Sequence, residues 1–140
     1  MGLFDGIDTA GSGLSAQQLR MDITSEKLAN ADTPGYRRQN VSLQSIGQSF
    51  GSILAGAGET LASASGGVEV SGVTADATPD KLVYDPSSPL ANAQGYVPMP
   101  NVDTVSEMTD LIDEQNSYQA DVTAMQTNKQ LFTQTLGLLK

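Results

Sequence analysis

The most constraining feature of this chain is a ladder of large apolar residues that runs to its C-terminal end. The rungs recur every seven residues, the spacing of helices that pack along a seam. A second ladder with the same period lies near the N-terminus. The residues between the two ladders show no heptad pattern. The rungs are Ile7, Leu14, Met21 and Leu28, and then Leu111, Tyr118, Met125, Phe132 and Leu139. The pattern predicts a mainly α chain whose terminal helices pair as an antiparallel coiled-coil hairpin, with these rungs as its assembly interface.

The first predicted helix covers residues 3–31 and ends before Pro34, because a residue that precedes proline is disfavoured in helical geometry. Gly35 follows as a turn residue. Gly11 and Gly13 lie inside this helix, where each costs about 1 kcal/mol relative to alanine. Two interpretations stay open: a break or hinge near residue 12, or the close approach of a neighbouring helix.

The second predicted helix covers residues 104–139, with Thr104 as its N-cap and Glu107 reaching back in a capping box. At about 1.5 Å per residue this helix is about 54 Å long, and a compact domain of this size has a radius of gyration of about 14 Å. It therefore protrudes and needs a partner. The row three residues before the rungs is partly polar, which favours burial among several subunits over an isolated hairpin with a weak seam. That row is Met108, Gln115, Val122, Lys129 and Leu136.

Between the helices we expect a small β-rich or irregular segment. Residues 36–46 are expected to be extended, and residues 47–67 form a Gly- and Ser-rich loop in which 52–61 is a short helix or strand. Short strands are predicted at 68–73, 81–84 and 94–97. The expected divisions are 1–46 (helix and turn), 47–100 (Gly-rich, β-containing middle) and 101–140 (helix).

Composition excludes several classes of function. The net charge of −9 disfavours nucleic-acid binding, and Arg37-Arg38 is the only adjacent basic pair. The chain has neither Cys nor His, which removes thiolate chemistry, disulfides and the usual transition-metal ligands. We expect no cleavable signal peptide and no membrane insertion, because no apolar stretch approaches the about 18 residues that a span needs.

The carboxylates do not indicate catalysis. Asp110, Asp113 and Glu114 share a helix face, but a solvated face lacks the dry, concave site that separates the pKa values of an acid–base pair. Asp76 and Asp80 lack the spacing of a calcium loop. The sequence therefore predicts no enzyme, no cofactor and no metal.

Several motifs make a resemblance recognisable. The run from Leu28 to Tyr36 (Leu-Ala-Asn-Ala-Asp-Thr-Pro-Gly-Tyr) and the tail from Pro100 to Met108, with Tyr118-Gln119-Ala120, resemble the two terminal motifs of bacterial flagellar rod and hook proteins. Within that family, the runs from Tyr84 to Pro89 and from Ala93 to Val97 resemble the proximal rod proteins. The first motif ends in a corner whose expected turn residues are Asn30, Thr33, Pro34, Gly35 and Tyr36.

The resemblance implies a structural subunit of the proximal rod, the drive shaft of the flagellar basal body. Such subunits are exported by the flagellar type III apparatus without a cleaved signal and assemble in the periplasm into a hollow tube for motility. The implied partners are copies of the chain, other rod proteins and the export-gate base. The alternative is a soluble coiled-coil adaptor or export chaperone, which folds alone and clamps one partner helix.

Overall fold

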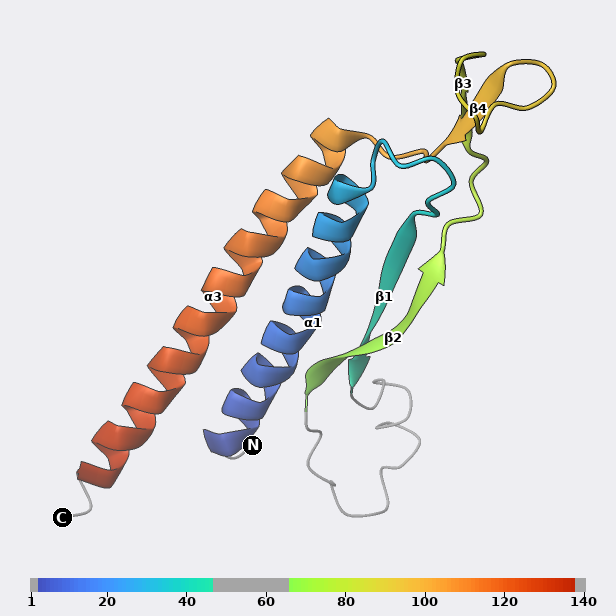
Figure 1. Ribbon diagram of the computed structural model, residues 1–140. Coiled ribbons are helices and arrows are strands. Elements are labelled where there is room, and N and C mark those ends of the chain that lie inside the picture. Colours follow the sequence, from blue (N-terminus) through green and yellow to red (C-terminus); the bar gives the residue numbers. More distant parts are fainter. Residues whose placement is uncertain (1–2, 47–65, 138–140) are drawn as a thin grey trace, which may run out of the picture.

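The computed structural model describes residues 3–46 and 66–137 as an elongated molecule built on two long helices (Figure 1). The helices lie side by side and run in opposite directions, and a two-stranded ribbon lies along the other side of the N-terminal helix. A second small ribbon extends beyond one end. The elements are α1 (Leu3–Ala29), β1 (Gln39–Ile46), β2 (Gly67–Ala75), β3 (Lys81–Tyr84), β4 (Tyr96–Met99) and α3 (Thr104–Gly137).

Helix α1 is continuous through Gly11 and Gly13, so a helix break near residue 12 is wrong. It ends two residues earlier than predicted: the N–H of Asn30 still donates to the carbonyl of Glu26 at 3.0 Å, but the N–H of Ala31 donates to the carbonyl of Leu28, three residues back, at 3.3 Å. The chain then turns, and the N–H of Thr33 donates to the carbonyl of Asn30 at 3.0 Å.

Helix α3 begins at Thr104 as predicted, but its N-cap is Asp103. The Asp103 carboxylate accepts the backbone N–H of Val105 at 3.0 Å and that of Ser106 at 3.4 Å. A carboxylate is a stronger acceptor for these unpaired donors than a hydroxyl. The capping box is therefore wrong, and the Glu107 side chain does not reach back to the cap but lies in an ion pair with α1.

The middle segment forms two separate antiparallel ribbons. In the first, β1 pairs with β2 from Gln39 opposite Ala75 to Ile46 opposite Gly67, with an irregularity between Ser42 and Leu43. In the second, β3 pairs with β4, which begins two residues later than the strand predicted at 94–97. The predicted loop at residues 47–65, including the short element at 52–61, lies outside the described residues.

The order of packing places α1 in the centre. It contacts α3 on one side and both strands of the β1–β2 ribbon on the other. Among the described residues, the β3–β4 ribbon contacts no other helix or strand. Few of the described side chains are buried, and as many of them are polar or charged as are aliphatic or proline. The apolar ones are Ala16, Ile23, Val97 and Pro100, and the polar ones are Thr24, Lys27, Glu107 and Glu114.

Candidate functional site: the helix pair and its exposed surfaces

The apolar rungs of both ladders are only half-buried in the isolated chain. Leu14, Met21 and Leu28 on α1 keep part of their surface in solvent, as do Leu111 and the next rungs on α3. The rungs therefore lie at the margin of the α1–α3 contact and not at its centre. Ile7, Tyr118, Met125 and Phe132 share this intermediate burial, and Leu139 lies outside the described residues.

A polar row, which sequence reasoning missed, lies between the two helices. It consists of four pairs, each made of one residue from α1 and one from α3. From one pair to the next, the α1 residue is seven positions later in the sequence and the α3 residue seven positions earlier. We call this set the polar ladder: Gly6–Asn128, Gly13–Asp121, Arg20–Glu114 and Lys27–Glu107. The row three residues before the α3 rungs does not line the contact with α1, since Met108, Gln115, Lys129 and Leu136 are exposed and Val122 is only half-buried. Its expected burial among several subunits stays a prediction.

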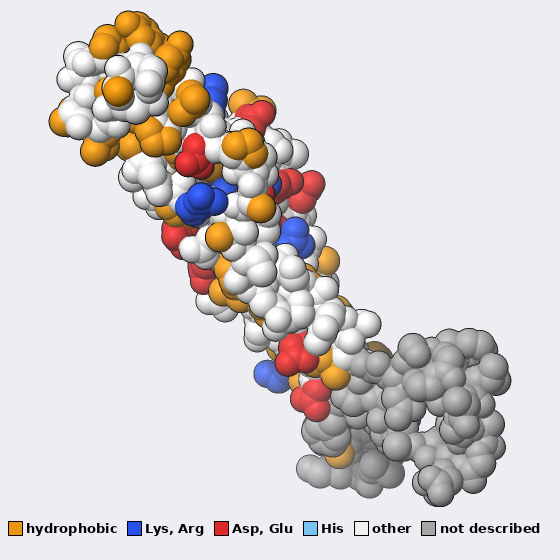
Figure 2. Space-filling model, turned by 90° about the vertical axis from the view of Figure 1, so that its right-hand side faces the viewer, with side chains coloured by type: hydrophobic (Ala, Val, Ile, Leu, Met, Phe, Trp, Pro, Cys, Tyr) orange, Lys and Arg blue, Asp and Glu red, His pale blue; other side chains and the backbone are white. Residues whose placement is uncertain are grey.

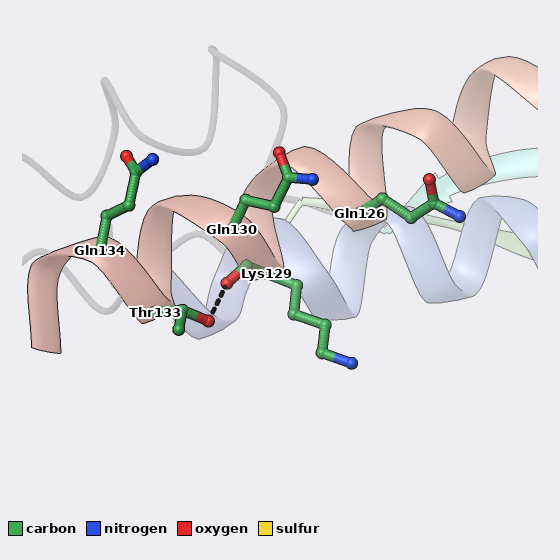
Figure 3. Close-up of a pocket in the computed structure, with 5 residues that line it drawn as sticks. All are labelled: Gln126, Lys129, Gln130, Thr133 and Gln134. Atoms are coloured by element: carbon green, nitrogen blue, oxygen red, sulfur yellow. Dashed lines mark hydrogen bonds between the residues drawn. The ribbon is translucent and has the colours of Figure 1, made fainter. Parts of the chain in front are cut away.

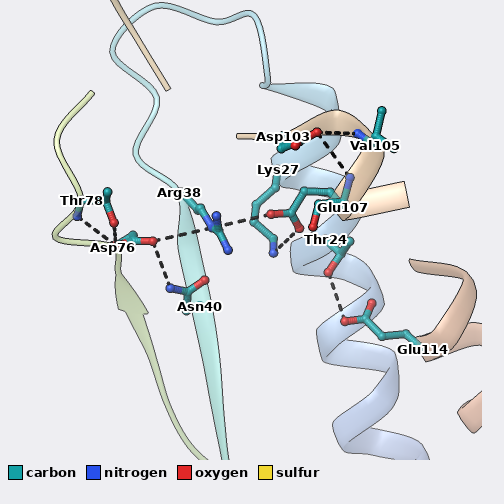
Figure 4. A network of polar contacts seen from close by, with 11 residues as sticks. Thr24, Lys27, Arg38, Asn40, Asp76, Thr78, Asp103, Val105, Glu107 and Glu114 are labelled. Carbon is teal, nitrogen blue, oxygen red and sulfur yellow. Dashed lines mark hydrogen bonds and ion pairs between the residues drawn. The ribbon is translucent and has the colours of Figure 1, made fainter. Parts of the chain in front are cut away.

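The half of the polar ladder nearest the corner consists of ion pairs. Lys27 Nζ lies 2.5 Å from Glu107 Oε2, and both side chains are almost fully buried. Arg38 Nε lies 3.6 Å from the other Glu107 oxygen and 3.7 Å from Asp76 Oδ2. Figure 4 shows this chain of charges running from α1 through Glu107 to the ends of β1 and β2. The network therefore ties both helices to the first ribbon.

Glu114 occupies the next position of the ladder. Arg20 Nε lies 3.4 Å from its Oε1 atom, and the Thr24 hydroxyl donates to the same oxygen at 3.2 Å. Burial raises the pKa of Glu114, and the charge of Arg20 opposes this rise. The three carboxylates expected on one helix face therefore lie in different environments. Asp110 and Asp113 are exposed to solvent, whereas Glu114 is buried against α1.

The other half of the ladder consists of glycines that let the helices approach. A Cβ atom on Gly6 would lie 3.2 Å from Asn128 Nδ2, and one on Gly13 would lie 3.1 Å from Asp121 Oδ2. Both distances are tighter than ordinary side-chain contacts. Of the two interpretations of the glycines, close approach is confirmed at Gly13. At Gly11 the nearest atom of α3, Met125 Cε, would be at an ordinary 3.9 Å.

The corner after α1 has the predicted turn chemistry. Pro34 and Gly35 are the central residues, and the N–H of Tyr36 donates to the carbonyl of Thr33 at 3.2 Å. Gly35 has a φ of +80°, which an L side chain adopts only with strain. Burial, and then the charge of Glu26, raises the pKa of Tyr36. The turn therefore holds the tyrosine against the end of α1.

Two apolar surfaces are exposed in the described part of the chain. The β3–β4 ribbon leaves Leu82 60% exposed and Tyr84 64% exposed, although the Tyr84 ring packs edge-on against Tyr96 at 5.3 Å. Figure 2 shows apolar side chains gathered at the end of the molecule that carries this ribbon. The second surface is the outer row of α3, made of Val105, Met108 and Ile112.

A third surface is polar and lies near the C-terminal end of α3. Figure 3 shows that its side chains come from one helix and do not converge on a common point. The Thr133 hydroxyl donates to the carbonyl of Lys129 at 2.9 Å, within the helix. Its glutamines recur every four residues and form a stripe along the helix: Gln126, Gln130 and Gln134.

In the loop between the two ribbons, the Asp76 carboxylate accepts hydrogen bonds from a residue of the same loop. The N–H and hydroxyl of Thr78 donate to Asp76 Oδ1, and these hydrogen bonds lower the pKa of Asp76. Asp80 is near, but within residues 3–46 and 66–137 no three acidic side chains gather as a metal site would require. No described helix is long and apolar enough to cross a membrane.

Comparison with known proteins identifies relatives along the whole chain. Two family descriptions match: "Flagella basal body rod protein" over residues 7–37, and "Flagellar basal body rod FlgEFG protein C-terminal" over residues 93–138. The first match contains α1 from its second turn and the corner, and the second contains β4 and α3.

Several full-length relatives share one name. A protein named "Flagellar basal-body rod protein FlgC" from Bacillus subtilis is 44% identical over 150 residues, which cover 100% of both chains. Proteins of the same name from Escherichia coli O6:H1 and Salmonella typhimurium are 41% and 40% identical, over 99% of this chain and 98% of each relative.

Proposed function

This chain belongs to the FlgC group of flagellar basal-body rod proteins and is a structural subunit of the rod; we propose that it serves in the proximal rod as one element of a hollow helical drive shaft. The full-length similarity carries the rod assignment. The unpartnered apolar surfaces support the helical tube, because they give neighbouring subunits something to cover.

The two apolar surfaces differ, and the helix and strands that carry them do not contact each other among residues 3–46 and 66–137. A contact between unlike surfaces of successive copies is heterologous, and such contacts build open helical assemblies unless the rotation closes a ring. A soluble adaptor or chaperone would instead bury its seams with one partner. Rod subunits have the opposite requirement, since each is surrounded by others.

The helix pair would form the inner wall of the tube as a short antiparallel coiled coil, and neighbours would cover the half-buried rungs. Full burial of one such side chain stabilises by about 1.5–3 kcal/mol. The assembly interface in this proposal is Ile7, Leu14, Met21, Leu28, Leu111, Tyr118, Met125, Phe132 and Leu139. The glutamine stripe would supply hydrogen bonds across subunit boundaries.

Residues 1–46, 47–100 and 101–140 would then act as inner helix and corner, outer β-containing middle, and second inner helix. The partners would be copies of this chain, other rod proteins and the base of the export gate. The subunit would leave the cell interior through the flagellar type III apparatus, without a cleaved signal, and assemble in the periplasm. Nothing in this role requires catalysis, and we infer none.

The test uses Ile112→Asp in a strain that lacks its own copy of the gene. Ile112 is 58% exposed, so the change leaves the helix content of the purified chain unaltered. If neighbours cover this residue, swimming in soft agar and rods in isolated basal bodies are lost while the exported subunit is still detected. The matched control is Asn116→Asp, which adds the same charge one turn later at an exposed polar position.

Wild-type swimming by the Ile112→Asp strain would refute the packing of neighbours on this row. Size-exclusion chromatography of the purified chain addresses the alternative. An adaptor elutes as a defined dimer or complex, whereas a rod subunit elutes as an extended monomer or as aggregates. Amide exchange gives a further check, since the ends of a free rod subunit are expected to exchange rapidly.

A further inference from the structure

We propose that two ion pairs, each with a buried glutamate, act as a register key, which selects one of several heptad alignments between α1 and α3. The register key is Arg20 with Glu114 and Lys27 with Glu107. The apolar ladders make this selection only in part. The slide that brings Lys27 to Glu114 still places large apolar rungs opposite those of α1, whereas the opposite slide leaves Leu28 beyond the first residue of α3.

The charges do distinguish the alignments. If α3 slides one heptad in one direction, Lys27 meets Glu114 and Arg20 meets Asp121. Glu107, which is 2% exposed, is then opposite Pro34 and loses its lysine. A buried carboxylate without its cation is strongly unfavourable. This alignment is therefore disfavoured, although every apolar rung is still matched.

A slide in the other direction fails at the opposite end of the key. Arg20 then meets Glu107, but Glu114 meets Gly13, which has no side chain to offer. Lys27 is left opposite Pro100. Only the observed alignment gives each of the two buried glutamates a cation, as Figure 4 shows for Glu107. A single buried polar position is known to fix register in this way in helical coils.

The consequence for assembly rests on the function proposed above, but the key itself rests on the geometry alone. A slip of one heptad moves α3 by about 10 Å along α1. The outer row of α3 and the glutamine stripe would then be displaced along the helix axis relative to α1. A neighbour that binds both helices could not contact them together. The register key thus determines which composite surface the subunit presents.

The absence of Cys permits a direct test by disulfide trapping in the purified full chain. Four double-cysteine reporters use the glycine half of the polar ladder. Gly6→Cys with Asn128→Cys, and Gly13→Cys with Asp121→Cys, report the observed alignment. Gly6→Cys with Asp121→Cys, and Gly13→Cys with Asn128→Cys, report the two slipped alignments.

With the key intact, the observed-alignment reporters should form disulfides about tenfold faster than the slipped ones, or more. In a variant with an apolar key (Arg20→Met, Lys27→Met, Glu107→Leu, Glu114→Leu), the difference should fall to about threefold or less, because only apolar rungs remain. If the apolar variant keeps the tenfold preference, the corner and the ribbons set the alignment and the proposal is overturned.

A reversed key covers the case in which the apolar variant does not fold. In this variant all four charges exchange sign (Arg20→Glu, Lys27→Glu, Glu107→Lys, Glu114→Lys), and Arg38→Gln removes the cation that lies 3.6 Å from Glu107. The observed alignment should then be kept. Reversal on α1 alone should abolish the preference. A reversed key that loses the preference, or a one-sided reversal that keeps it, overturns the proposal. Swimming of the same strains tests the rod function separately, because the disulfide pattern does not depend on it.

Discussion

Replacement of Lys27 by methionine is the sharpest single test of how the helix pair is held together. Methionine keeps most of the apolar stem of lysine and removes its charge. Glu107 would then be a buried carboxylate, 2% exposed, whose remaining cation is Arg38 at 3.6 Å. The substitution therefore isolates the value of one buried ion pair.

The expected loss can be bounded. Removal of one partner from a buried pair costs about 3–5 kcal/mol, and the surviving Arg38 contact reduces this to about 2–3 kcal/mol here. With a urea slope of about 1.5–2 kcal/mol per M, the unfolding midpoint should fall by about 1–2 M. The same change at Lys129, which is exposed on α3, should move the midpoint by about 0.3 M or less.

The assay is urea unfolding of the purified chain, followed by circular dichroism at a helix band, for wild type and both variants. A third variant, Lys27→Met with Glu107→Leu, should recover most of the loss, because an apolar pair of similar volume is often as stable as a buried ion pair. Equal midpoints for Lys27→Met and Lys129→Met would refute the reasoning, as would a double variant weaker than Lys27→Met alone.

Three further outcomes are expected. Gly35→Val forces an L side chain to a φ of +80°, which costs about 1–2 kcal/mol of strain, and should reduce swimming more than export. The control is Gly72→Ala, at a position with open space and an ordinary φ, which should change neither. Equal loss of swimming and export would indicate a secretion role for the corner. Gly11→Ala should raise the thermal midpoint more than Gly13→Ala, because both gain about 1 kcal/mol of helix propensity but only Gly13 would crowd a side chain, at 3.1 Å. Burial raises the folded-state pKa of Glu114, so its stabilising effect is full below the unfolded value of about 4.3 and is lost as pH rises through the folded pKa. The melting temperature of Glu114→Gln relative to wild type should therefore increase from about pH 4 to about pH 7, and a constant difference would contradict the burial.

Local chemistry made much of this molecule predictable. The two helices follow from heptad spacing, the corner from the geometry of Pro34 and Gly35, and the strand at Lys81–Tyr84 from a short run that includes Val83 and an aromatic residue. These features depend on residues close together in the chain. The rod family was recognisable for the same reason, because its motifs are short contiguous runs near both termini.

The helix cap shows where such reasoning ended. Thr104 and Glu107 satisfy the capping pattern, but Asp103 caps the helix and Glu107 pairs with a lysine eighty residues away in sequence. A signal for that pairing was present, since Arg20 and Lys27 each precede a rung of α1 by one residue and repeat its heptad. The repeat alone does not say which flank of a helix faces its partner.

The sequence by itself determined the elements, their order and the family, because the information for each is local. The tertiary structure decided which polar row lies between the helices, which glutamates lose contact with water, and that the β3–β4 ribbon stands apart from the helices. These outcomes depend on how the two helices are rotated and aligned. That alignment depends on which charged groups are buried and whether each has a partner of opposite charge. The partners lie far apart in the sequence.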